Sequence, residues 1–201
     1  MTVSGLTGVA AITAAALDSC AALADTTERC WGDNYGGELG NGTNGGGSEL
    51  PVVVSGLSGV TAVAGSCALV TDTTVRCWGG KPAWATGTPV GVSSTVPVAI
   101  AGLIGVTAID LRCALTAATT VRCWGYNNFG QLGNGTNVNS TPPVTVSALT
   151  GVAAIASGGS HECALLTGGT VACWGQNDVG QLDSWATGPV PTRASPSSCP
   201  G

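Results

Sequence analysis

Eight of the nine cysteines in this 201-residue chain form four pairs with one spacing. In each pair the second cysteine follows ten positions after the first and precedes Trp-Gly, as in CALVTDTTVRCWG (67–79). A strand, a short turn and a returning strand would place two such cysteines opposite each other. Their Cα atoms would then lie about 4.5–5.5 Å apart, within reach of a disulfide. The spacing therefore predicts four hairpin disulfides, which are Cys20–Cys30, Cys67–Cys77, Cys113–Cys123 and Cys163–Cys173.

Other uses of the cysteines fit this spacing less well, although buried reduced thiols remain an alternative. Zinc ligands usually lie two to four residues apart, and redox catalysis uses Cys-x-x-Cys, which the chain lacks. Cys199 has no partner in the pattern. Four disulfides are typical of an oxidising compartment, so we expect an extracellular or cell-surface protein. The opening residues MTVSGLTGVAAITAAAL lack the positive charge of a signal peptide.

The segments that would position these cysteines recur as well. Cys-Trp-Gly begins at Cys30, Cys77, Cys123 and Cys173, at intervals of 47, 46 and 50 residues. Each unit contains an apolar segment, the cysteine hairpin, a Gly- and Asn-rich loop and a Pro-led segment. The segments are short and β-branched and are bounded by turn residues, which predicts strands. Four strands per unit would form a small antiparallel sheet that buries its faces by stacking, as propeller blades do.

Two stretches resemble the repeat of the regulator of chromosome condensation family: GGSHECALL…VACWGQNDVGQL (158–182) and CWGYNNFGQLGNGT (123–136). In that family seven repeats form a seven-bladed β-propeller. This chain departs from the pattern because it has four repeats, and the second reads CWGGKPAWATGT (77–88) where GQLGNGT is expected. We therefore expect an all-β fold of four blades with about four antiparallel strands each, forming an open arc or a fragment of a larger propeller. A single repeat domain would span 1–201, with units at 8–58, 59–104, 105–150 and 151–196 and a tail at 197–201.

Composition and motifs argue against several classes of function. The net charge is −5, and the six Lys and Arg residues form no basic run, so nucleic-acid binding is not expected. No apolar run reaches the ~18 residues of a membrane span. His161 is the only histidine, and the G-x-S-x-G motif of a serine hydrolase is absent. We expect no enzyme activity, no cofactor and no metal site; an enzyme with an unrecognised site is the least favoured alternative.

The loops after Cys-Trp-Gly are the best candidate for a binding surface. Equivalent loops of stacked blades emerge on one side, and aromatic residues often carry interface energy. We expect a protein-interaction or scaffold module, with Trp84 and Trp185 as anchors and Tyr35, Tyr126 and Phe129 as support. The acidic residues of these loops favour a neutral or basic partner, whose identity the sequence does not give. The resemblance implies an alternative, guanine-nucleotide exchange on a small GTPase. Open propeller edges also predict self-association.

Overall fold

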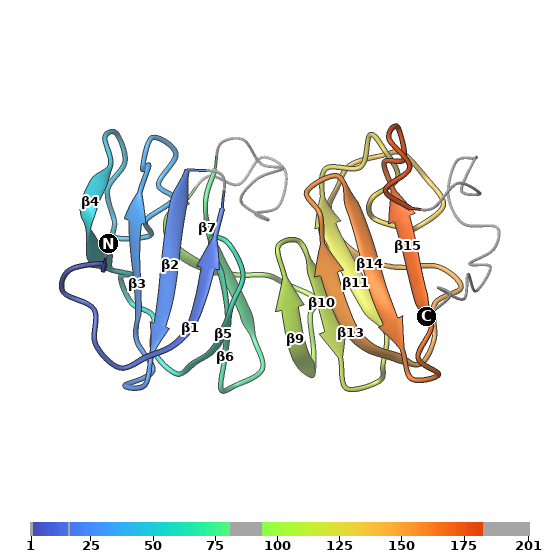
Figure 1. The fold of residues 1–201 in the computed structure, drawn as a ribbon, viewed down its shortest axis with the longest axis horizontal. Helices are drawn as coiled ribbons and strands as arrows, with labels where there is room; N and C mark the ends of the chain where they lie inside the picture. The colour runs from blue at the N-terminus through green and yellow to red at the C-terminus, as the bar shows by residue number, and fades with distance from the viewer. Residues whose placement is uncertain (1, 16, 81–93, 183–201) are drawn as a thin grey trace.

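The computed structural model describes residues 2–15, 17–80 and 94–182. Within these residues every regular element is a β-strand, and the fifteen strands form four antiparallel sheets (Figure 1). The predicted all-β fold is confirmed.

Each sheet takes consecutive strands in chain order, and we call the sheets blades 1 to 4. Blade 1 contains β1 (Val9–Ala14), β2 (Asp18–Leu23), β3 (Glu28–Gly32) and β4 (Ser48–Val53). Blade 2 contains β5 (Val60–Val63), β6 (Cys67–Val70), β7 (Val75–Gly79) and β8 (Ser94–Ala99). Blade 3 contains β9 (Val106–Asp110), β10 (Cys113–Thr116), β11 (Val121–Gly125) and β12 (Ser140–Thr145). Within the described residues, blade 4 contains β13 (Val152–Ser157), β14 (His161–Leu166) and β15 (Val171–Gly175).

The blades follow one another in an arc around a common axis. The first strands of successive blades contact each other: β1 with β5, β5 with β9, and β9 with β13. These strands therefore line the axis. The fourth strands, β4, β8 and β12, lie at the outside. Among the described residues, the extensive contacts between blades all join blades that are consecutive in sequence. In Figure 1 the arc runs from blue to orange. The predicted propeller-type arrangement of four blades is therefore confirmed.

Apolar clusters fill the junctions between blades. The cluster between blades 2 and 3 joins the disulfide-bonded Cys67 and Cys77 and the buried Val75 to Ala114 and Trp124. Equivalent clusters lie between blades 1 and 2 and between blades 3 and 4. Because side chains alternate along a strand, residues two positions apart, such as Val75 and Cys77, face the same neighbouring blade. Each junction thus joins the disulfide face of one blade to the tryptophan face of the next.

Candidate interaction surface

The cysteine pairs lie directly opposite each other on the second and third strands of every blade. The register pairs Cys67 with Cys77 and Cys113 with Cys123, as the ten-residue spacing predicts. A disulfide joins each of the four predicted pairs, and its two Cα atoms lie 4.1 Å apart. Each bond closes the central hairpin of its blade, and the first three lie in the junction with the next blade. The disulfides therefore stiffen the sheets from which the neighbouring loops project.

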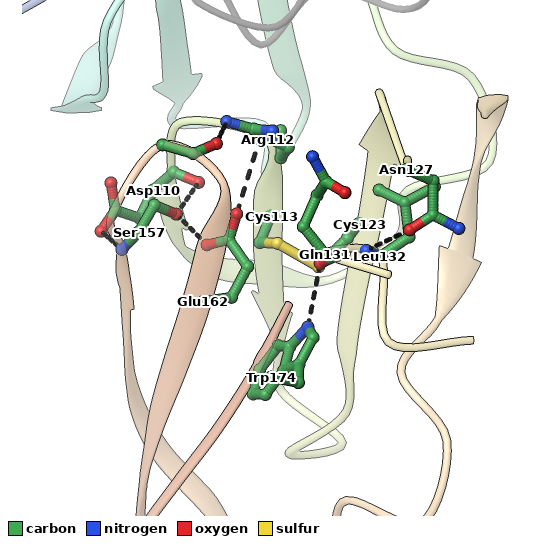
Figure 2. The surroundings of a disulfide bond; sticks show 11 residues. Asp110, Arg112, Cys113, Cys123, Asn127, Gln131, Leu132, Ser157, Glu162 and Trp174 are labelled. Atoms are coloured by element: carbon green, nitrogen blue, oxygen red, sulfur yellow. Dashed lines mark hydrogen bonds and ion pairs between the residues drawn. A yellow bond between two sulfur atoms is a disulfide. The ribbon is translucent and has the colours of Figure 1, made fainter. Parts of the chain in front are cut away.

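The tryptophan that follows the second cysteine connects one blade to the loop of the preceding blade. The indole N–H of Trp78 donates a hydrogen bond to the carbonyl of Glu38 at 2.8 Å, and that of Trp174 donates to the carbonyl of Gln131 at 2.9 Å. Figure 2 shows the second bond beside the Cys113–Cys123 disulfide. These side chains are buried, so they hold the structure together and are not available to a partner.

Two glycines make room for these indoles. A Cβ on Gly40 would lie 2.8 Å from Trp78 Nε1, and a Cβ on Gly133 would lie 2.9 Å from Trp174 Nε1. Both glycines also have a positive φ, +61° and +62°, which favours a residue without a side chain. The glycine of the Leu-Gly-Asn-Gly phrase is therefore required by close approach of the next blade as well as by the turn.

The loops after the third strands, which we call the post-Trp loops (33–47, 126–139 and 176–182), are held by repeated side-chain bonds. In each loop an asparagine Oδ1 accepts the N–H of a leucine five residues later, at 2.8–3.0 Å: Asn34 with Leu39, Asn127 with Leu132 and Asn177 with Leu182. In each loop a side-chain oxygen of a Glu or Gln also accepts a hydrogen bond from the backbone N–H two residues earlier: Glu38 from Gly36, Gln131 from Phe129 and Gln181 from Val179. Sequence reasoning missed these asparagines, although their constant place after Trp-Gly was a usable signal.

The post-Trp loops extend from one side of the arc, at the top of Figure 1. They also carry exposed apolar side chains. The exposed fractions are 77% for Tyr35, 45% for Phe129 and 88% for Val179. Tyr126 is half-buried, and its hydroxyl accepts a hydrogen bond from Asn128 Nδ2 at 2.8 Å. Tyr126 and Phe129 thus share one loop, whereas Tyr35 belongs to blade 1. The predicted anchors Trp84 and Trp185 lie outside the described residues.

A buried polar network crosses the junction between blades 3 and 4 (Figure 2). Arg112 Nε lies 3.6 Å from Glu162 Oε1, and both side chains are buried. Arg112 also donates to the carbonyl of Gly159. Ser157 donates through its hydroxyl to Glu162 and through its N–H to Asp110 Oδ2 at 2.8 Å. Burial raises the pKa of Glu162 to about 8, although the Arg112 guanidinium opposes this shift. The network is placed to hold the two blades together.

A second buried acid, Glu28, lies in the junction between blades 1 and 2 without such support. Its Oε1 atom lies 3.9 Å from Cys30 Sγ, and Oε2 has no hydrogen-bond partner within the described part of the chain. Burial raises its pKa to about 8. With Cys20 and Cys30 it forms the only cluster of three potential metal ligands found among the described residues. Because the sulfurs are joined in a disulfide, they offer no thiolate to an ion.

A third group of acids lies in blade 1 beside its post-Trp loop. Burial, followed by the nearby carboxylates of Glu38 and Asp33, raises the pKa of Asp18 to about 6. One oxygen of Asp18 and one of Glu38 are buried and have no hydrogen-bond partner among the described residues. His161 occupies the equivalent position at the start of the second strand of blade 4. This corner of blade 1 therefore carries negative charge that blade 4 lacks.

Family comparison agrees with this geometry. The profile described as "Regulator of chromosome condensation (RCC1) repeat" matches residues 120–165, and a second profile with the same description matches residues 152–181. The chain carries RCC1 repeats. The matches include the post-Trp loop of blade 3 and the Cys163–Cys173 hairpin of blade 4. A comparison with curated protein sequences found no match.

Three solved structures resemble most of the chain. Human WBSCR16 has a TM-score of 0.74 and 22% identity, over 91% of this chain and 53% of that one. Yeast RCC1 (Prp20) bound to Kap60 has a TM-score of 0.76 and 20% identity, over 96% of this chain and 50% of that one. Prp20p from Saccharomyces cerevisiae, described with its binding to Gsp1p and histones, has a TM-score of 0.69 and 22% identity, over 87% and 45%.

These likenesses concern the fold. The chain spans about half the length of the solved structures that it matches. Where the structure describes the chain, no helix has the length and apolar character needed to span a bilayer.

Proposed function

We propose that the chain is a non-enzymatic protein-interaction module and that the post-Trp loops bind the partner. The observation that supports this most strongly is the exposure of Tyr35, Phe129 and Val179 on loops that are otherwise tightly hydrogen-bonded. Side chains on ordered loops lose little conformational freedom on binding, which favours affinity. The solved propellers described with Kap60, Gsp1p and histones bind proteins, which agrees with such a role.

The partner we propose is neutral or basic. Among the described residues of the post-Trp loops, Asp178 is exposed and Asp33 is half-buried, and the chain carries a net charge of −5. Complementary charge would steer such a partner to the loops and raise the association rate.

We also propose that the protein works in an oxidising compartment, outside the cell or at its surface. The four disulfides support this, because reducing conditions would break the cross-link in every blade. Guanine-nucleotide exchange on a small GTPase is the second candidate function, and the solved Prp20p described with Gsp1p favours it.

Site-specific photo-cross-linking tests the proposal. A photoreactive residue at Tyr35 or Phe129 should capture the partner, whereas the same residue at Ile104 should not. Ile104 is a matched control because it is 85% exposed and precedes β9, at the opposite edge of the arc from the post-Trp loops. The partner is then purified, and its Kd is measured with Tyr35→Ala, Phe129→Ala and Ile104→Ala.

The first two variants should each weaken binding about 30-fold, the effect of a typical 2 kcal/mol hot-spot residue, and Ile104→Ala should leave Kd unchanged. Equal cross-linking at all three positions would contradict the proposal. A captured small GTPase whose nucleotide release is accelerated by the chain would favour the second function instead.

A further inference from the structure

Two acidic side chains of blade 1, Asp18 and Glu38, are deeply buried. Asp18 begins β2, and Glu38 lies in the post-Trp loop of the same blade. The exposed fraction is 9% for Asp18 and 3% for Glu38. Burying a carboxylate is unfavourable unless its oxygens have partners. The environment of each oxygen therefore indicates what these acids do.

One oxygen of Glu38 has a structural role that a neutral side chain also fills. Oε2 accepts a hydrogen bond from the Gly36 N–H at 2.7 Å, which orders the loop. Gln131 and Gln181 accept the equivalent bond in blades 3 and 4 with an amide oxygen. Oε1 of Glu38 is buried and has no hydrogen-bond partner among the described residues. The loop thus needs an acceptor at this position, but it does not need a negative charge.

Asp18 carries a second buried oxygen of this kind. Its Oδ2 atom has no hydrogen-bond partner within the described part of the chain. Asp18 lies two residues before Cys20, so its side chain is on the disulfide face, which packs against blade 2. The equivalent positions of blades 2, 3 and 4 carry Gly65, Leu111 and His161. Among the four blades, only blade 1 has an acid here.

Backbone contacts fix Asp18 beside the loop that carries Glu38. Asp18 pairs with Gly32 across the sheet, and a Cβ added to Gly32 would lie 2.7 Å from Asp18 Cα. The Asp33 N–H donates a hydrogen bond to the Leu17 carbonyl at 2.9 Å. These contacts tie the start of β2 to the start of the post-Trp loop, so the two acids are held on one corner of the blade.

We call Asp18, Glu38 and Asp33 the acid corner, because their charges act on one another. After burial, the carboxylate of Glu38 raises the pKa of Asp18 most, and that of Asp33 raises it further. No basic side chain of the described residues offsets this repulsion. The three carboxylates do not all lie within 4.8 Å of one another. Asp33, which has the weaker effect, therefore adds charge at the edge of the corner.

We propose that the acid corner binds a Ca²⁺ ion, with Asp18 Oδ2 and Glu38 Oε1 as direct ligands and Asp33 as a further negative charge. A divalent cation gives both buried oxygens a partner and offsets the repulsion between the carboxylates. Carboxylate oxygens suit Ca²⁺ or Mg²⁺ better than softer metals. Because the two oxygens are buried, the ion must lose much of its water shell, which Mg²⁺ does reluctantly. This inference holds whether or not the post-Trp loops bind a partner.

Calorimetric titration with CaCl₂ tests the proposal. The full chain, with its disulfides intact, is treated with EDTA, dialysed and titrated at neutral pH. One ion should bind per chain with a Kd of about 10⁻⁴–10⁻³ M, the range of extracellular calcium modules. MgCl₂ should bind at least about 10-fold more weakly, because Mg²⁺ keeps its water. Equal affinity for the two ions would contradict binding through buried oxygens.

Three variants show whether the ion lies at this corner. Asp18→Asn and Glu38→Gln should each raise the Kd about 10-fold or more, because each removes an ionic ligand. Asp178→Asn is the matched control, since it changes the net charge equally at an exposed acid in the post-Trp loop of blade 4. This control should leave the Kd unchanged. Circular dichroism establishes that each variant is folded.

A measurement on the unmodified chain does not depend on how the variants fold. The carboxyl-carbon NMR signals of Asp18 and Glu38 should shift as CaCl₂ is added, and the signal of Asp178 should not. A chain that shows no saturable binding up to about 10 mM CaCl₂, ten times the weakest expected Kd, would overturn the proposal. Binding that Asp178→Asn weakens as much as Glu38→Gln would also overturn it, because general charge attraction would then hold the ion.

Discussion

The junction between blades 1 and 2 and the junction between blades 3 and 4 share a framework but bury different acids. Both contain a disulfide, a tryptophan bound to a loop carbonyl, and a glycine under that tryptophan. The first junction buries Glu28, whose Oε2 has no hydrogen-bond partner among the described residues, and the other buries Glu162 with Arg112 and Ser157. The framework thus sets the geometry of a junction, while the side chains buried between the blades set its electrostatic cost. Variants at these sites separate the two contributions.

The largest effect is expected at Arg112. Arg112→Met removes the guanidinium from buried Glu162 and should lower the free energy of unfolding by roughly 3–5 kcal/mol, as breaking a buried ion pair does. Urea unfolding at pH 7 measures it. Arg122→Met is the control, because Arg122 is less buried and donates to the carbonyls of Gly102 and Pro143, and not to an acid, within the described part of the chain. Equal losses for the two variants would show that Arg112 does not act through Glu162.

The next effect has the opposite sign and is expected at Glu28. Glu28→Val inserts the residue that blades 2 and 3 carry at the same position, Val75 and Val121. The folded pKa of Glu28 is about 8, above its ordinary value of 4.5. Keeping this carboxyl buried therefore costs stability progressively as the pH rises from about 4.5 to about 8. At pH 7 the variant should be more stable by roughly 3 kcal/mol.

The pH dependence provides the control for Glu28. The gain from Glu28→Val should be small at pH 4, where the carboxyl is protonated in both folded and unfolded states, and should grow toward pH 8. Urea unfolding at several pH values follows it. A gain that does not change with pH would mean that packing, and not the buried charge, separates the two junctions.

The shared framework is tested at Gly133. A Cβ added to Gly133 would lie 2.8 Å from Val146 Cγ1 and 2.9 Å from Trp174 Nε1. A Cβ added to Gly135 would have no neighbouring atom within 4 Å. Both glycines have a positive φ. Gly133→Ala should therefore cost about 2–3 kcal/mol, and Gly135→Ala should cost about 1 kcal/mol from the backbone alone. Thermal unfolding compares them, and equal costs would argue against close contact between the loop and the indole.

The smallest effect is expected in blade 1. Glu38→Gln inserts the residue found at Gln131 and Gln181, keeps an acceptor for the Gly36 N–H, and removes a negative charge near Asp18. The pKa of Asp18, about 6, should fall toward its ordinary 3.8. Because the raised pKa costs stability as the pH rises from about 4 to about 6, the variant should gain less than about 1 kcal/mol at pH 7. NMR titration of the Asp18 carboxyl measures the shift, and an unchanged pKa would contradict the coupling.

Repetition made the fold predictable, and departures from repetition hid most of the buried polar groups. Four copies of one hairpin indicate strands, blades and the opposition of Cys67 to Cys77 without any knowledge of packing. Glu28 was missed because it looks like an ordinary strand-end charge, although its place two residues before Cys30 puts it on the buried face. Arg112 and Glu162 come from separate blades 50 residues apart, so only the packed junction reveals the pair. Tyr35 and Phe129 were expected at the surface from their loops, and their binding role remains a prediction.

One disulfide closes the central hairpin of every blade. The most direct measurement is the intact mass of the natively purified protein, denatured without reductant and treated with a thiol-alkylating reagent. Eight of the nine cysteines are paired in this account, so one label is expected, on Cys199 if it is free, and nine are expected after reduction. Peptide mapping should then link Cys20 to Cys30, Cys67 to Cys77, Cys113 to Cys123 and Cys163 to Cys173. Nine labels on the unreduced protein would contradict the account.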